Sequence, residues 1–223
     1  MDRVVETGFG DAEAEINAYK DSPFILKMLQ GCLQSAGRIF SGGITGEAVD
    51  LGCGDGQGIE IFCNDYPSLN WTGIDSSPFA ISAANTRKLA SSFSSQMTFT
   101  EADFTSNTTE YDFCFSCNAL HHIPTGLDFW NAVKASTKSG GKIYIVDFVR
   151  ADSESDIDGF ITTLKNMNVY SSEQFYTDAK ASFKSCYSES EINADLSSAG
   201  LNLNVRINDI DVGLSTVEIY GTK

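Results

Sequence analysis

Apolar residues along the chain fall into short runs that alternate with longer amphipathic stretches. The runs are rich in β-branched and aromatic residues, as in residues 71–75 and 142–148, and the stretches between them show helical spacing. Strands that alternate with helices in this way are typical of a parallel sheet with crossover helices on both faces. The pattern therefore predicts an α/β fold.

The runs predict seven strands, of which the last two form a closing pair. We expect the strands at residues 47–51, 71–75, 97–101, 111–116, 142–148, 203–207 and 215–220. We expect a first helical stretch at about residues 12–40, with a restart at Ser22-Pro23, and a helix that follows the glycines at residues 52–58 and runs through Asn64. Further helices are expected at about residues 77–92, 126–137, 151–187 and 188–200. The fold class that follows is a Rossmann-like three-layer sandwich, with a seven-stranded, mostly parallel sheet and an antiparallel last strand.

Several helix ends carry recognisable capping residues. Ser77-Pro78 places a capping side chain before a proline at the first helical position. Ser188 and Glu191 have the spacing of a capping box, and Gly200 suits the end of that last helix. No proline-rich or serine-rich linker interrupts the pattern, so we expect a single domain.

The charge of the chain argues against nucleic acid as a partner. Thirty carboxylates face fifteen Lys and Arg residues, for a net charge of −15, whereas nucleic-acid binding depends on cations that neutralise phosphates. The chain has no apolar run long enough for a membrane span, and its N-terminus lacks the features of a signal peptide. We therefore expect a cytoplasmic protein that binds neither nucleic acid nor a membrane.

The six cysteines are predicted to be small buried hydrophobes rather than disulfides. Cys53 lies inside a glycine-rich turn, and Cys114 and Cys117 lie in an apolar run. The last two have C-x-x-C spacing, but on a strand their side chains point to opposite faces. This placement suits neither a zinc knuckle nor a thioredoxin-like pair.

The turn after the first strand carries the strongest chemical signal. It reads Gly52-Cys53-Gly54-Asp55-Gly56-Gln57-Gly58 and leads directly into a helix. Glycines allow a ligand to approach the backbone, and the helix N-terminus presents free N–H groups. The spacing does not fit the G-x-G-x-x-G fingerprint of dinucleotide-binding proteins, and no Gly-Lys-Ser/Thr follows as in a P-loop.

This turn resembles the first motif of the class I S-adenosylmethionine-dependent methyltransferases. The motif reads Val49-Asp50-Leu51-Gly52-Cys53-Gly54-Asp55-Gly56 in this chain. Further similarities follow in order: Asp75 after the second strand, Glu101-Ala102-Asp103-Phe104 after the third, residues 111–122 over the fourth strand and its loop, and residues 138–142 before the fifth strand. The similarity covers about residues 47–147 and the final strand pair.

The resemblance implies S-adenosylmethionine as methyl donor and S-adenosylhomocysteine as product. It assigns Asp75 to the ribose hydroxyls, Asp103 to the adenine amine, Phe104 to the face of the adenine ring, and Asp50 to the amino-acid end of the cofactor. The full set of expected cofactor-binding residues is Asp50, Gly52, Gly54, Gly56, Asp75, Ser76, Asp103, Phe104 and Asn118. Methyl transfer is an in-line displacement, in which the protein aligns the reactants and excludes water.

His121 and His122, the only histidines in the chain, follow the fourth strand. In the fold that the resemblance implies, this loop faces the transferred methyl group. One histidine is a candidate general base, because an unperturbed pKa of about 6.5 suits deprotonation of an acceptor. Alternatively, both shape the wall of the pocket or bond to the backbone. With no other histidine available, no metal site is expected.

Each acidic residue also has a structural interpretation that remains open. Asp50 suits a satisfied turn carboxylate, Asp75 a cap for the helix that begins at Ser77, and Asp103 a loop start. Two other functions also remain open: another user of the same cofactor, such as an aminopropyltransferase-like enzyme, and a non-catalytic cofactor-binding subunit. The segment Asn118-Ala119-Leu120-His121 departs from the Asn/Asp-Pro-Pro-Tyr/Phe signature of methyltransferases that act on planar amides or exocyclic amines. This difference disfavours a nucleobase or glutamine nitrogen as the acceptor.

The long segment at residues 151–187 is expected to close the site over a small-molecule acceptor. It exceeds an ordinary connection and concentrates aromatic residues. Together with helices around Tyr19 and Phe24, it would form a lid. The single domain then comprises N-terminal helices (1–43), a cofactor-binding core (44–150), a helical lid (151–187), and a closing helix and strand pair (188–223).

Overall fold

A seven-stranded sheet forms the centre of the protein, as the sequence pattern predicts. The computed structural model describes residues 1–6, 13–20, 23–41, 43–166, 173–210 and 214–223. The sheet order is β3-β2-β1-β4-β5-β7-β6; β1 to β5 pair in parallel and β7 is antiparallel to both of its neighbours. The strands are β1 (Gly46–Leu51), β2 (Leu69–Asp75), β3 (Met97–Glu101), β4 (Tyr111–Cys117), β5 (Thr137–Phe148), β6 (Asn204–Ile210) and β7 (Leu214–Thr222).

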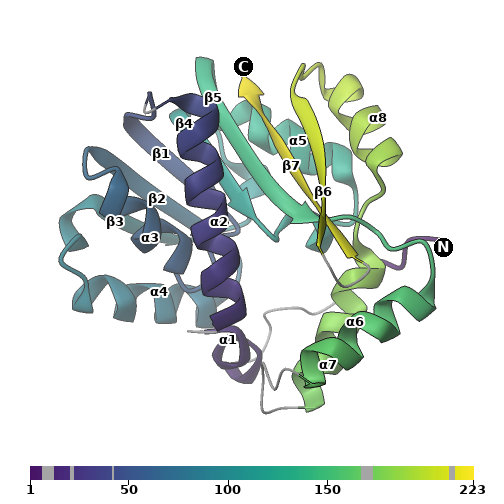
Figure 1. The fold of residues 1–223 in the computed structure, drawn as a ribbon. Coiled ribbons are helices and arrows are strands. Elements are labelled where there is room, and N and C mark those ends of the chain that lie inside the picture. Colours follow the sequence, from purple (N-terminus) through teal and green to yellow (C-terminus); the bar gives the residue numbers. More distant parts are fainter. Residues whose placement is uncertain (7–12, 21–22, 42, 167–172, 211–213) are drawn as a thin grey trace.

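Helices cover both faces of this sheet (Figure 1). The α-helices are α1 (Glu13–Tyr19), α2 (Pro23–Phe40), α3 (Gln57–Asp65), α4 (Pro78–Ala90), α5 (Gly126–Ala135), α6 (Glu154–Asn166), α7 (Glu173–Ser185) and α8 (Glu189–Ala199). Short 3-10 turns are η1 (Ser94–Gln96), η2 (Phe104–Ser106) and η3 (Leu120–His122). The expected caps are present: Ser77 accepts from the Ala80 amide at 3.2 Å, and Ser188 forms a capping box with Glu191.

Two elements differ most clearly from the sequence-based expectation. Strand β5 begins at Thr137 rather than at Lys142, because the backbone passes through Gly140 at φ 78° with a shift of register against β4 and then continues as strand. The predicted helical stretch at residues 151–187 contains two helices, α6 and α7. Tyr170, which the sequence places in this stretch, lies outside the described residues.

Two apolar clusters cover the two faces of the sheet. One contains Phe129 and Trp130 of α5 with residues of α8, and the other contains Phe62 of α3 with residues of α2. Cys114 belongs to the first cluster and Cys117 packs against the second, so the two point to opposite faces as predicted. All six cysteines carry free thiols.

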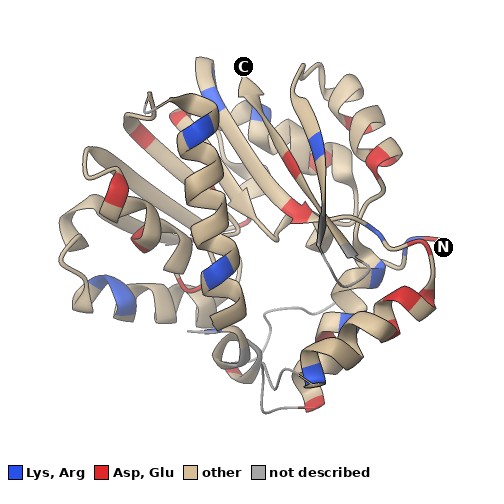
Figure 2. Ribbon diagram, in the orientation of Figure 1, with Lys and Arg blue, Asp and Glu red and all other residues tan. Residues whose placement is uncertain are grey.

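Helices α1, α6 and α7 lie together at the end of the sheet to which β5 runs (Figure 1). A third apolar cluster joins them, with α6 and α7 packed against Tyr19, Phe24 and Met28. Lys and Arg are spread over several elements in the view of Figure 2. None of the helices in the described part of the chain combines the length and apolar character needed to cross a membrane.

Phe62 is expected to be essential for stability. Its buried ring lies 4.9 Å from the Phe115 ring and 5.5 Å from the Trp71 ring, measured between centroids. We expect Phe62→Ala to lower the free energy of unfolding by about 3–5 kcal/mol in denaturant titration, because it removes these contacts and leaves a cavity. The matched control is Leu89→Ala, whose side chain is 86% exposed. Equal losses for both variants would contradict this account of the core.

Candidate active site

The glycine-rich turn between β1 and α3 is shaped by three positive φ angles. Gly52, Gly54 and Gly56 have φ of 76°, 53° and 77°, a region that side-chain-bearing residues rarely adopt. A Cβ on Gly52 would lie 2.5 Å from the Ala119 Cβ, so this turn and the loop after β4 approach each other without room for a side chain. A Cβ on Gly54 would meet nothing within 4 Å.

The same turn is tied to the end of β2. The amides of Gly52 and Cys53 donate to the Ile74 carbonyl at 2.8 and 3.1 Å, and the Gly54 amide donates to Asp75 Oδ2 at 2.9 Å. The other carboxylate oxygen of Asp75 accepts from the Ser77 amide at 2.9 Å. Asp75 thus binds backbone on both sides, while Ser77 itself is the residue that caps α4.

Asp50 is a buried carboxylate with an unsatisfied oxygen. Its side chain lies at the end of β1 and is 3% exposed. Asp50 Oδ1 has no hydrogen-bond partner within the described part of the chain. Burial, and then the charge of Asp75, raises the pKa of Asp50 well above its usual range. A buried acceptor of this kind is costly unless a ligand supplies a donor or a positive charge.

Asn118 presents a second unsatisfied oxygen on the opposite loop. It has φ of 59°, and its amide donates to the Val146 carbonyl at 2.9 Å. Asn118 Oδ1 has no partner among the residues that the structure describes. Its Nδ2 lies 3.5 Å from Met28 Sδ, which places the side chain between the β4 loop and α2.

Asp103 and Phe104 have different surroundings. Asp103 is exposed and accepts from the Thr105 amide at 2.8 Å and the Thr105 hydroxyl at 2.7 Å, so it caps the short turn η2. Phe104 is buried, and its ring packs edge to face on Phe129 at 5.9 Å between centroids.

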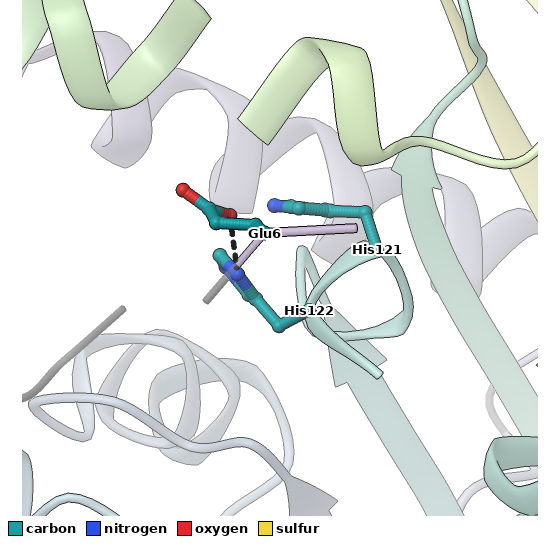
Figure 3. A group of neighbouring side chains, drawn as sticks. All are labelled: Glu6, His121 and His122. Carbon is teal, nitrogen blue, oxygen red and sulfur yellow. Dashed lines mark ion pairs between the residues drawn. The ribbon is translucent and has the colours of Figure 1, made fainter. Parts of the chain in front are cut away.

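The two histidines after β4 are held by two different carboxylates. His121 Nδ1 lies 2.6 Å from Asp147 Oδ1, and the His121 amide donates to Asp147 Oδ2 at 3.2 Å. His122 Nδ1 lies 2.9 Å from Glu6 Oε2 (Figure 3). The two imidazole rings are neighbours, with centroids 4.0 Å apart. Each histidine therefore has a carboxylate partner.

These surroundings move the pKa values of the two rings in opposite directions. Burial disfavours a charged His121, but the charge and hydrogen bond of Asp147 outweigh burial and raise the pKa of His121. Burial and the neighbouring His121 lower the pKa of His122 to about 4. Burial works against an ionised Glu6, yet the hydrogen bond and charge of His122 lower the pKa of Glu6.

The ligand atoms of Glu6, His121 and His122 lie within 4.8 Å of one another. Imidazole and carboxylate are ligands that zinc and similar divalent ions accept. In the structure, however, the Nδ1 atoms of both rings face carboxylates. The arrangement therefore consists of two histidine–carboxylate pairs, His121 with Asp147 and His122 with Glu6.

One pocket joins these residues to α1, α2, α6 and α7, with a cavity volume of about 280 Å³. Of the cofactor-binding and catalytic residues predicted from sequence, nine line it: Asp50, Gly52, Gly54, Asp75, Ser76, Phe104, Asn118, His121 and His122. Two lie outside its lining. Asp103 caps η2, and Gly56 is the N-cap residue before α3. A Cβ on Gly56 would lie 2.6 Å from the Phe99 ring.

The far side of the pocket is mainly apolar. It includes side chains from four helices: Tyr19, Phe24, Met28, Leu164, Phe175, Ala179 and Phe183. The Tyr19 and Phe175 rings pack 4.9 Å apart between centroids. These segments are distant from the glycine-rich turn in sequence, and they line the same pocket.

Sequence reasoning missed two of the carboxylates in this region. Asp147 interrupts the apolar end of β5, next to β4 in the sheet, so neighbouring strand ends could have pointed to its contact with His121. Glu6 belongs to an N-terminal segment with no regular structure. No local pattern marks it, and only the tertiary contact with His122 reveals it.

The donor set fits S-adenosylmethionine. Asp50 Oδ1 and Asn118 Oδ1 are unsatisfied acceptors suited to the cofactor's ammonium group. Asp75 offers a carboxylate for ribose hydroxyls, Phe104 an apolar ring for adenine, and the open space at Gly54 a close approach to the backbone. The site therefore meets the requirements of this cofactor at each of its three parts.

Comparison with known proteins supports this interpretation. Residues 49–143 match a family model described as a methyltransferase domain. No curated protein matches the chain in sequence.

Solved structures with the same fold extend the similarity to nearly the whole chain. The plantazolicin methyltransferase BpumL in complex with SAH and a monoazolic desmethylPZN analog is 16% identical, with a TM-score of 0.67 over 93% of this chain and 88% of that one. An O-methyltransferase family protein from Burkholderia thailandensis is 14% identical, with a TM-score of 0.60 over 95% and 57%. A putative O-methyltransferase from Nostoc punctiforme is 13% identical, with a TM-score of 0.62 over 96% and 59%.

At these identities the solved structures establish the fold, while the family model identifies the segment that carries the glycine-rich turn and both acidic strand ends. Residues 49–143 therefore carry a methyltransferase domain match, and the whole chain has the fold of solved methyltransferases.

Proposed function

We propose that the protein transfers the methyl group of S-adenosylmethionine to a small molecule with an apolar body. The observation that carries this proposal is the single pocket that connects the glycine-rich turn and Asp50 to an aromatic chamber containing both histidines. The cofactor supplies a methyl group already activated on its sulfonium. The chain supplies binding, alignment and exclusion of water. We place the protein in the cytoplasm.

The residues of the cofactor half take distinct roles in this proposal. Asp75 accepts the ribose hydroxyls, Phe104 packs against adenine, and Asp50 and Asn118 accept from the ammonium group. Gly52 and Gly54 allow close approach of the backbone, and Ser76 lines the ribose side. Gly56 and Asp103 act through the backbone conformations that they set.

The acceptor half is formed by the N-terminal helices and by α6 and α7, which we propose act as a lid. Leu164 of α6 and Phe175 of α7 line the same pocket as Gly54. Tyr19 and Phe24 contribute from the other side. An apolar lining of this kind favours an acceptor whose body is apolar and whose reacting group is polar.

The direct test is a methyl-transfer assay against pooled phenols, carboxylates, amines and thiols, with S-adenosylhomocysteine as the measured product. We expect turnover with at least one apolar acceptor. Tight binding of S-adenosylhomocysteine with no turnover on any pool would favour a non-catalytic cofactor-binding subunit. Formation of methylthioadenosine instead would favour an aminopropyltransferase-like reaction.

Asp75→Ala is expected to weaken binding of S-adenosylhomocysteine by about tenfold or more, equivalent to about 1.4 kcal/mol. The reason is the loss of a carboxylate that accepts ribose hydroxyls. Calorimetric titration measures the effect. The matched control is Asp65→Ala, which removes an exposed carboxylate outside the pocket. Unchanged affinity in Asp75→Ala would remove Asp75 from the site.

Binding of S-adenosylhomocysteine is expected to weaken as the pH falls through the raised pKa of Asp50. Below that pKa the carboxyl is protonated and cannot pair with the ligand's ammonium group; above it the carboxylate is available, so binding is tighter at higher pH. Asp50→Asn should bind more weakly and lose this pH dependence. Calorimetry across a pH series measures both, and an equally steep pH dependence in Asp50→Asn would assign it to another group.

A further inference from the structure

The N-terminal segment, residues 1–6, is held by Arg3 against the end of α7 and the loop after η3. The Arg3 guanidinium donates to the backbone carbonyls of Ser185 at 2.6 Å, Pro124 at 2.8 Å and Ile123 at 2.9 Å. It also lies 3.9 Å from the centroid of the Tyr187 ring. One side chain thus joins the end of α7 to the loop that follows η3, and it positions the residues next to it.

The same segment carries Glu6, whose carboxylate contacts His122 and Ser182, two residues that line the pocket. Glu6 is 8% exposed at its side chain, accepts from the Ser182 hydroxyl at 3.1 Å, and lies 2.9 Å from His122 Nδ1. Figure 3 shows its carboxylate directed to the two histidine rings. A carboxylate side chain is rarely buried without a partner, because loss of solvent destabilises its charge.

The two histidine–carboxylate pairs differ in a way that suits different tasks. His121 is 4% exposed and its partner Asp147 is 1% exposed and also binds the His121 amide, so this pair is a closed structural unit. The side chain of His122 is 21% exposed and lines the pocket. A base needs contact with the acceptor, and His122 has the greater access.

We propose that His122 is the base that takes the proton of the methyl acceptor and that Glu6 is its positioning residue. The inference rests on the proposed methyl transfer. The Glu6 carboxylate, with Oε2 2.9 Å from Nδ1, stabilises a proton on Nδ1, so the lone pair of the neutral ring lies on Nε2. The acceptor's O–H or N–H bond breaks as the proton moves to Nε2, and its electron pair forms the bond to the methyl carbon.

The carbon–sulfur bond breaks in the same displacement, and its electron pair leaves with S-adenosylhomocysteine. His122 then holds the extra proton as an imidazolium, paired with the Glu6 carboxylate, until solvent removes it. His121 stays paired with Asp147 and shapes the wall of the pocket. The charged and titratable groups that face His122 are Glu6, His121 and Asp147, with Arg3 behind them.

The charge states in the site agree with this division. The lowered pKa of His122, about 4, keeps its ring neutral and able to accept a proton at neutral pH, whereas the raised pKa of His121 favours its charged form. If His121 were the base, turnover would fall as the pH dropped through that raised pKa. With His122 as the base, turnover should stay level over that range.

The test begins with a readout that needs no acceptor. Because the chain has two histidines, long-range proton–nitrogen NMR of the protein bound to S-adenosylhomocysteine resolves all four ring nitrogens, and His121→Asn assigns them. We expect His122 as the neutral Nδ1–H tautomer from about pH 5.5 to about pH 8. Glu6→Ala should remove the preference for that tautomer. The matched control is Asp2→Asn, an exposed acid on the same segment, and it should change nothing.

The second readout is turnover with an acceptor found in the pooled assay. We expect Glu6→Gln and His122→Asn each to lower kcat about tenfold or more with unchanged affinity for S-adenosylhomocysteine. Glu6→Asp should recover part of the loss, and Glu6→Gln should cost little more in a His122→Asn background. A merely structural Glu6 would lower affinity and kcat together.

Three results would overturn the inference. The first is an unchanged His122 tautomer in Glu6→Ala. The second is loss of turnover in His121→Asn but not in His122→Asn. The third is turnover that a chelator abolishes and zinc restores, because Glu6, His121 and His122 would then be metal ligands. If no pool is methylated by the unaltered protein, the proposed function fails, and the tautomer experiment still decides whether Glu6 positions His122.

Discussion

The close approach of two loops at the carboxyl ends of the strands is the constraint on which the site depends. Gly52 faces Ala119 at a distance that leaves no room for a Cβ, and the amides of the same turn bond to the end of β2. The three strand ends are thereby fixed relative to one another. Because Asp50 and Asp75 lie at the ends of β1 and β2 and Asn118 directly follows β4, fixing the turn also fixes their carboxylate and amide oxygens.

The site places unsatisfied acceptors where the fold alone would gain by avoiding them. Asp50 is buried beside another carboxylate, with one oxygen unpaired, and its raised pKa expresses the cost of the charge. An apolar residue at this point of β1 would suit the surrounding core better. The unsatisfied carboxylate therefore agrees with the ligand-binding role that we propose for Asp50, since strained or unsatisfied groups mark functional positions in other proteins.

The sequence pattern predicts the fold and singles out most of the residues around the glycine-rich turn that line the pocket, because these features depend on local pattern. Alternating runs predict the strands, and a glycine-rich turn with an acid at each of two strand ends marks the pocket. The start of β5 was placed five residues late, because Gly140-Gly141 signals a turn locally whereas sheet pairing continues the strand through it. At Asp103 the local pattern allows two interpretations, because an acidic residue after a strand can either cap a helical turn or bind a ligand. In the structure Asp103 caps η2.

The histidine pair could be located from sequence, but its chemistry could not be resolved. Which ring is charged depends on Asp147 from a neighbouring strand and on Glu6 from the far end of the chain. Glu6 is held there by Ser182, and its segment is held by Arg3 and the Val4 amide, which bind the end of α7. A contact of that kind has no sequence period or spacing to reveal it, because it depends on the tertiary structure alone.

The two halves of the pocket therefore have different origins in the chain. The matched family segment, residues 49–143, contains the glycine-rich turn, Asp75 and both histidines, but it ends before α6 and begins after α2. Glu6, Tyr19 and Phe175 all lie outside it. A family match over that segment thus identifies the methyl donor and leaves the acceptor open. Under the proposed function, the segments that line the far side of the pocket select the acceptor, and such segments can vary while the sheet and its donor site stay the same.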